Sequence, residues 1–130
     1  MKFFKGYYFP DTEEHFVQFL KLNNTTSYQG AVRKKSFKFL ENNRVAIDIG
    51  ANVGLWARDI CQTFNEVKLF EPCKLNLECL KKNLENFQNF QIFDCALSNK
   101  NISGKLNIIE TGLGSNSIAP IDGSTKTENI

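Results

Sequence analysis

With 130 residues the chain suits one domain, and a hydrophobic content of 42% that includes 12 phenylalanines lets it bury a core. The formal net charge is only +2 and the charges are mixed along the chain, so we expect neither a nucleic-acid-binding surface nor a membrane-binding one. The densest basic cluster falls on a predicted helix and is interpreted as a solvated face: Arg33, Lys34, Lys35 and Lys38.

The four cysteines are interpreted as reduced thiols in the core, because each stands where a small buried apolar residue would fit. None belongs to a Cys-x-x-Cys pair and His15 is the only histidine, so the sequence predicts no metal site. The first residues lack the long apolar core of a secretory signal, and no apolar run approaches transmembrane length. We therefore expect a soluble, cytoplasmic protein. The cysteines are Cys61, Cys73, Cys79 and Cys95.

The N-terminal segment, residues 1–43, is expected to be mainly helical. Asp11, with Glu14 three residues later, predicts a capping box for a helix over 12–22. After a polar break, Ser27 is placed to cap a second helix, which runs to about residue 42.

From residue 44 onward, strands and helices alternate at short spacing. The expected strands are 44–49, 67–71, 90–97 and 105–110, and the expected helices are 54–64 and 74–86. This alternation predicts an α/β fold, a three-layer Rossmann-like parallel sheet with helical crossovers on both faces. Residues 44–118 would form this core, and the polar tail at 119–130 is expected to add little packed structure.

The first strand of this core leads into a glycine turn, Gly50-Ala-Asn-Val-Gly54, and then into a helix. Such a turn lets the backbone approach a ligand, because glycine has no Cβ and adopts the φ values that tight turns need. The N–H groups at the start of the following helix point toward the same place. The stretch therefore predicts a ligand site, in which Asn52 stands where a dinucleotide-binding turn has its second glycine.

Acidic residues at the ends of the next two strands indicate what the turn binds. Glu71, followed by Pro72, ends the second strand, where a carboxylate can accept hydrogen bonds from both hydroxyls of a ribose. Asp94 ends the third strand and could bind an adenine amino group, with the backbone of Cys95 and Ala96 beside the ring. Together these positions predict a site for an adenosine ligand.

Asp48 lies inside the otherwise apolar first strand, where a charge is costly unless it is hydrogen-bonded. It could pin the glycine loop, which is a structural role, or reach a ligand ammonium directly or through water. Because the turn lacks the glycine that makes room for a pyrophosphate, the pattern argues against a nicotinamide cofactor. S-adenosylmethionine (SAM) has adenine, ribose and an amino-acid tail without a pyrophosphate, and Asn52 could bond that tail.

These stretches resemble the FkbM-type SAM-dependent methyltransferases, a family within the class I Rossmann-like methyltransferases. The matching segments are Ala46-Ile-Asp-Ile-Gly-Ala-Asn-Val-Gly54, Leu69-Phe-Glu-Pro72, Asn76, Leu80 to Leu84 and Ala96-Leu-Ser98. The resemblance covers roughly residues 45 to 118, and a looser match precedes it at residues 10–15 and 28–29. It implies that the chain binds SAM and transfers its methyl group to a small acceptor, commonly to a hydroxyl oxygen of a sugar.

The resemblance also bears on residues before the glycine turn. It implies that Tyr28 and Gln29 cover the cofactor, while packing in the core is an equal alternative for Tyr28. The sequence leaves the catalytic base open. His15 is a candidate, because histidine alone has an unperturbed pKa near neutrality, and an exposed surface histidine is the alternative.

Members of the family continue with an Asp-rich strand, typically Lys-x-Asp-x-Glu-Gly, which this sequence does not contain. We therefore expect a sheet that is incomplete on its C-terminal side, with an exposed edge at the fourth strand that favours self-association. A truncated, non-catalytic SAM-binding or assembly subunit is the alternative to an active methyltransferase.

Overall fold

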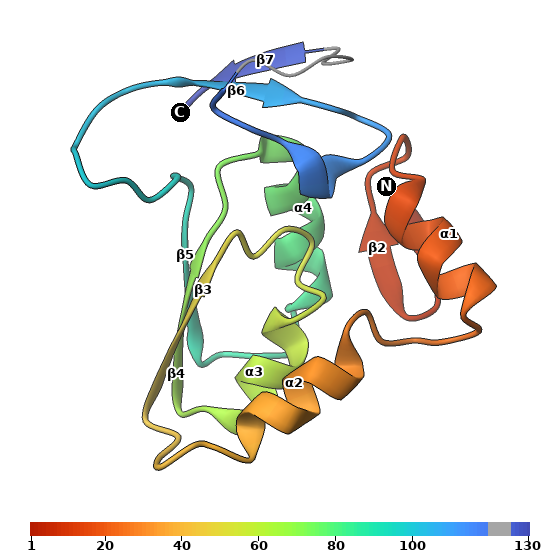
Figure 1. Cartoon of the computed structure of the whole chain (residues 1–130), viewed down its shortest axis with the longest axis vertical. Coiled ribbons are helices and arrows are strands. Elements are labelled where there is room, and N and C mark those ends of the chain that lie inside the picture. The colour runs from red at the N-terminus through yellow and green to blue at the C-terminus, as the bar shows by residue number, and fades with distance from the viewer. Residues whose placement is uncertain (120–125) are drawn as a thin grey trace.

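The structure is a computed structural model that describes residues 1–119 and 126–130. At its centre is a three-stranded parallel sheet of order β3-β4-β5, shown in Figure 1. Its strands are β3 (Val45–Ile49), β4 (Glu66–Phe70) and β5 (Phe90–Phe93), and the crossovers are α3 (Ala57–Thr63) and α4 (Lys74–Asn83). The predicted α/β class, with a parallel sheet and flanking helices, is confirmed.

The hydrophobic core lies between the sheet and its two crossover helices. Val67 and Leu69 of β4 are fully buried, and they pack in one cluster with apolar residues of both helices. The helix residues in this cluster are Ala57, Ile60, Cys61, Leu77 and Leu80. Because both helices share one cluster with the same side of β4, they cover the same face of the sheet (Figure 1).

The prediction of crossovers on both faces is wrong for this part of the chain. The strand order moves in one direction, and two right-handed crossovers then place their helices on one face. On the opposite face Val45, Ile47 and Ile49 are 48%, 60% and 65% exposed. Beside them the rings of Phe70 and Phe93 stack with centroids 4.7 Å apart. We call this set of five apolar residues the open face.

The N-terminal segment holds the two predicted helices, α1 (His15–Leu22) and α2 (Gly30–Phe37). Both are shorter than predicted, and neither has a side-chain N-cap bond, so the capping roles given to Asp11 and Ser27 are wrong. The N–H of Phe16 instead bonds the carboxylate of Glu13.

A hairpin that the sequence reading missed precedes these helices. Its strands are β1 (Lys2–Phe4) and β2 (Tyr7–Phe9), and its turn holds Lys5 and Gly6 at positive φ. Asn83 of α4 clamps it, because its amide exchanges two hydrogen bonds with the backbone of Tyr8 and donates a third to the Val53 carbonyl. The N-terminal segment thus packs on the same helix that follows β4.

The predicted fourth strand exists as β6 (Lys105–Ile108), but it pairs antiparallel with β7 (Lys126–Asn129) and does not extend the parallel sheet. Within the described residues, the fourth strand is therefore not the edge of the parallel sheet, whose strands with a single neighbour are β3 and β5. The self-association predicted from an exposed edge stays a prediction. A 3-10 turn, η1 (Leu113–Ser115), lies between β6 and β7. The presence of β7 also corrects the expectation of little packed structure after residue 118. Residues 120–125 of the predicted tail lie outside the described residues.

Two interpretations of single residues are corrected. Arg33 does not belong to a solvated face, because it is 1% exposed and its guanidinium bonds the carboxylate of Asp59 at 2.6 and 2.7 Å. Cys95 is an exposed thiol, whereas the other three cysteines are buried and free, as predicted. In residues 1–119 and 126–130, no group of three or more His, Cys, Asp and Glu side chains is placed to hold a metal ion. No helix there is long and apolar enough to cross a membrane.

Candidate functional site

The glycine turn after β3 has the tight geometry that its sequence predicts. Gly50, Asn52 and Gly54 have φ values of 79°, 52° and 91°, which an asparagine tolerates better than most side chains. The N–H groups of Gly50 and Ala51 both bond the Phe70 carbonyl, at 2.8 and 3.0 Å, so the turn is fixed to the end of β4.

Gly54 serves the packing of this turn. A Cβ at Gly54 would lie 2.9 Å from Cδ1 of Leu80, so a side chain there would push the turn away from α4. Gly54 lines none of the cavities described below. Gly54, which the sequence predicted to bind the cofactor, therefore supports the turn through its packing and does not line these cavities.

A cavity of about 430 Å³ lies at the carboxyl ends of the three parallel strands. We call it the Glu71 cavity. It brings together six of the residues that the sequence assigned to the cofactor: Gly50, Asn52, Glu71, Pro72, Cys95 and Ala96. Residues of the β6–β7 region close its other side, among them Leu113 and Gly114.

Glu71 is buried and its carboxylate is largely occupied by the protein itself. Oε2 accepts a hydrogen bond from the N–H of Asn52 at 2.8 Å, and Oε1 accepts from the N–H of Cys73 at 3.0 Å and from Nδ2 of Asn76 at 3.2 Å. Burial raises the pKa of Glu71, and these hydrogen bonds oppose that shift. Glu71 thus ties the glycine turn to the start of α4.

A second cavity, of about 320 Å³, lies on the other side of the turn. We call it the Asp48 cavity, and it adjoins the first because both are lined by Ile49, Gly50, Asn52 and Gly114. It brings together the predicted residues Tyr28, Gln29 and Asp48 with the same turn.

Unlike Glu71, Asp48 has a carboxylate oxygen that the protein does not satisfy. Its Oδ2 is buried and accepts no hydrogen bond. Burial, with a smaller contribution from the charge of Glu71, raises the pKa of Asp48 to about 6. An orphaned carboxylate oxygen beside a cavity can bind a cationic or hydrogen-bond-donating group of a ligand.

The N-terminal segment supplies the aromatic wall of the Asp48 cavity. The ring of Tyr28 meets those of Phe16 and Phe19 edge-on, with centroids 4.9 and 5.0 Å apart. The Gln29 amide oxygen accepts a hydrogen bond from the indole N–H of Trp56 at 3.0 Å. Tyr28 therefore packs against the core and also lines the cavity, and its predicted role in covering the cofactor stays a prediction. Phe16 and Trp56 line the cavity as well, and the sequence reading missed both.

Two predicted site residues lie apart from these cavities. Asp94 is exposed and lines no cavity described in residues 1–119 and 126–130. His15 is exposed at the start of α1, and its ring meets the edge of Phe16. Both stay predictions that rest on the sequence.

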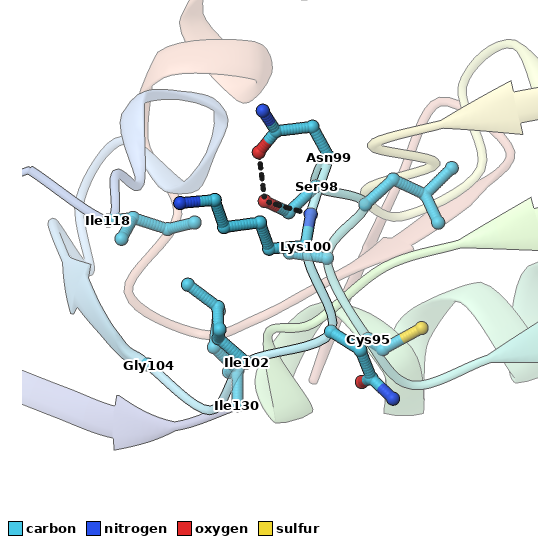
Figure 2. Close-up of a pocket in the computed structure, with 11 residues that line it drawn as sticks. Cys95, Ser98, Asn99, Lys100, Ile102, Gly104, Ile118 and Ile130 are labelled. Atoms are coloured by element: carbon cyan, nitrogen blue, oxygen red, sulfur yellow. Dashed lines mark hydrogen bonds between the residues drawn. The ribbon is translucent and has the colours of Figure 1, made fainter.

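A third cavity, of about 410 Å³, extends the site beyond Cys95 and is shown in Figure 2. It shares Cys95, Ala96, Leu97 and Ile118 with the Glu71 cavity. The loop after β5 forms much of its wall, and Ser98, Asn99 and Lys100 are joined there by long hydrogen bonds of 3.4 to 3.5 Å. The third cavity thus adjoins the Glu71 cavity on this side.

No protein-family model and no curated protein sequence matches the chain. Among solved structures, it is similar to phosphoethanolamine N-methyltransferase 1 of Haemonchus contortus in complex with phosphoethanolamine and S-adenosylhomocysteine. The match has a TM-score of 0.47 and 19% identity, and it covers 65% of this chain and 18% of that one. At this identity and TM-score the likeness is one of fold alone.

Proposed function

We propose that the chain is the SAM-binding core of a class I, FkbM-type methyltransferase that acts on a hydroxyl group of a sugar or another small acceptor. The observation that carries this proposal is the pair of cavities that adjoin at Gly50 and Asn52. One has the orphaned Asp48 oxygen, and the other is bordered by the strand ends that follow β4 and β5. SAM has an amino-acid tail with an ammonium group at one end and a nucleoside at the other, so it suits both cavities.

The residues present fit this cofactor. Asp48 is the group for the tail ammonium, because its desolvated carboxylate gains most from a cation. Glu71 is the group for the ribose: a carboxylate offers about four acceptor positions and three are used, so one remains. Ala96 and Pro72 offer apolar surface for adenine, and Asp94 is proposed to reach its amino group.

When bound, SAM supplies a methyl group that is already activated on a sulfonium. The chain then has to orient the acceptor, to exclude water and to take up the hydroxyl proton. Tyr28 and Gln29 are proposed to cover the cofactor on the side of the Asp48 cavity. His15 is proposed as the base on the strength of its residue type alone.

Isothermal titration calorimetry with S-adenosylhomocysteine, using NAD as the comparison ligand, tests the proposal. We expect S-adenosylhomocysteine to bind and NAD to stay silent. Asp48→Asn should weaken binding at least about tenfold, since a charge-assisted hydrogen bond is lost. Asp11→Asn is the matched control, because Asp11 is an exposed acid that lines neither cavity. Silence of the unmodified chain toward S-adenosylhomocysteine would contradict the proposal.

A non-catalytic SAM-binding or assembly subunit is the second candidate. The observation that favours it is that His15, the candidate base, lines neither cofactor cavity. Methyl transfer from labelled SAM to a panel of hydroxyl-bearing acceptors separates the two candidates. We place either one in the cytoplasm, where thiols such as the three buried cysteines stay reduced.

A further inference from the structure

A short loop from the β6–β7 region lies across the glycine turn. Backbone hydrogen bonds of 2.8 and 3.0 Å between Asn107 and Ser117 close the loop at its base. Inside it, the N–H of Ile109 bonds the side-chain oxygen of Asn116 at 3.1 Å, and η1 forms its tip. We call residues 109–116 the strap.

The strap forms a wall that the two cofactor cavities share. Gly114 lines both of them, and Leu113 lines the Glu71 cavity while its side chain is buried. The carbonyl of Leu113 accepts a hydrogen bond from the side chain of Asn52 at 3.3 Å. The position of the strap therefore determines how wide the site is beside the turn.

The strap is also bonded to the start of α1, which it approaches in Figure 1. Glu13 is fully buried, and its two carboxylate oxygens serve two different elements. Oε1 accepts from the N–H of Phe16 and Oε2 from the N–H of Leu113, each at 2.8 Å. The carbonyl of Thr111, in the strap, accepts hydrogen bonds from the N–H groups of Glu14 and His15, at 3.0 and 3.2 Å.

Such a placement is unusual for a carboxylate. Burying a charge is costly unless it is well hydrogen-bonded, and no salt bridge found in residues 1–119 and 126–130 involves Glu13. Its two bonds join the element that carries Phe16 into the Asp48 cavity to the element that carries Gly114 into both cavities. The contact also spans 100 positions of the sequence, so it holds together segments that the chain itself does not.

We propose that Glu13 is a positioning residue that latches the strap to α1 and thereby sets the width of the cofactor site at the junction of its two cavities. The inference rests on the proposed function for its effect on SAM, but the latch itself is a property of the ligand-free chain. Breaking the latch frees the strap to move away from the glycine turn and loosens the grip on the cofactor.

Amide hydrogen exchange measured by NMR tests the latch without any ligand. Glu13→Gln keeps the shape of the side chain but turns an amino group toward one of the two N–H donors, and Glu13→Ala removes both acceptors. We expect the exchange of the Leu113 amide to rise at least about tenfold in each variant, while amides of β4 keep their protection. Glu14→Gln is the matched control, because Glu14 is an exposed neighbour that bonds the strap through its backbone only.

Gly114→Ala tests the same arrangement from the other side without touching Glu13. A Cβ at Gly114 would lie 2.9 Å from Cζ of Phe16, so the close contact between the strap and the Phe16 ring has to open. We expect the same rise in exchange at Leu113 and, in both kinds of variant, a weaker affinity for S-adenosylhomocysteine by about three- to tenfold. The loss should be smaller for 5′-methylthioadenosine, which lacks the amino-acid tail and makes no use of the Phe16 wall.

The outcomes separate this inference from the proposed function. Faster exchange confined to the strap, together with silence of the unmodified chain toward both ligands, would keep the latch and overturn the proposed function. Unchanged exchange at Leu113, or an equal rise at Leu113 and in β4, would overturn the latch. Equal losses of affinity for the two ligands would overturn its role in setting the width of the site.

Discussion

Two acids at the carboxyl ends of neighbouring strands, Asp48 in β3 and Glu71 just after β4, differ in how the protein satisfies them. Glu71 accepts three hydrogen bonds, from two backbone N–H groups and one side-chain amide. Asp48 has a buried oxygen with no partner. Burial raises the pKa of both.

The difference separates an acid that holds the turn, Glu71, from an acid that the protein leaves partly unsatisfied, Asp48, and that we propose binds the cofactor. Glu71 contributes to stability in the ligand-free chain, because it satisfies donors that would otherwise be buried without a partner. Asp48 lowers stability there, since nothing compensates the loss of water around its oxygen. Glu71 would keep one wall of the proposed site rigid, and the unsatisfied carboxylate of Asp48 would bind a cation at the other wall.

The largest effect is expected from Glu71→Ala. It leaves the N–H groups of Asn52 and Cys73 and the amide of Asn76 without their acceptor, which should lower the free energy of unfolding by about 3 kcal/mol. Urea unfolding followed by circular dichroism measures this. Glu66→Ala is the control, because the side chain of Glu66 is 54% exposed and faces Lys68 at 3.4 Å. Equal urea midpoints for the two variants would show that Glu71 stabilises the chain no more than an exposed acid does, which would contradict its contrast with Asp48.

The next effect has the opposite sign and comes from Asp48→Asn. Because the pKa of Asp48 is raised to about 6 in the folded chain, its carboxyl favours folding below pH 4, and this advantage is lost as pH rises to 6. Asp48→Asn should therefore stabilise the chain by roughly 2 kcal/mol above pH 6 and flatten the stability curve between pH 4 and 6. Thermal unfolding across this pH range measures both, and a less stable variant at pH 7 would break the contrast.

The same acid should control cofactor binding in the reverse direction. Between pH 5 and pH 7 the unmodified chain should bind S-adenosylhomocysteine more tightly as Asp48 becomes charged, by up to about tenfold, and Asp48→Asn should lose this dependence. Calorimetry at the two pH values decides the point. A dependence that persists in Asp48→Asn would assign it to another group.

Local pattern was enough to predict the strand, turn and helix around Gly50, because glycines, β-branched residues and strand-end acids there act over a few positions. It could equally have revealed the N-terminal hairpin, since Lys5-Gly6 between aromatic residues is a signal for a tight hairpin turn. The partners of Glu71 and the latch at Glu13 depend on contacts between distant segments, which no local pattern encodes. The one-sided sheet follows from strand order, which alternation of strands and helices leaves open.

A smaller effect is expected from the open face, which lies on the side of β3 opposite to Asp48. We propose that this face and the unpaired edge of β3 cause self-association. Ile47→Glu should reduce it without a cost above about 0.5 kcal/mol in stability, because the new carboxylate stands opposite Lys68 in the sheet. Sedimentation velocity over a range of concentrations measures it, with Val32→Glu on α2 as the matched control. Equal self-association of the two variants would show that the open face does not form the interface.

The smallest effect is expected from His15→Ala. This variant tests whether Asp48 and Glu71 account for cofactor binding without a contribution from His15. His15 is exposed and lines neither cofactor cavity, so its loss should change the affinity for S-adenosylhomocysteine by less than about twofold. The backbone N–H of residue 15 still bonds Thr111 in the variant, which keeps the strap in place. Methyl transfer is the second measurement: a lower rate at unchanged affinity would identify His15 as the base, and an unchanged rate would return that role to an unassigned group. A large loss of affinity would mean that binding extends beyond Asp48 and Glu71 to the first turn of α1.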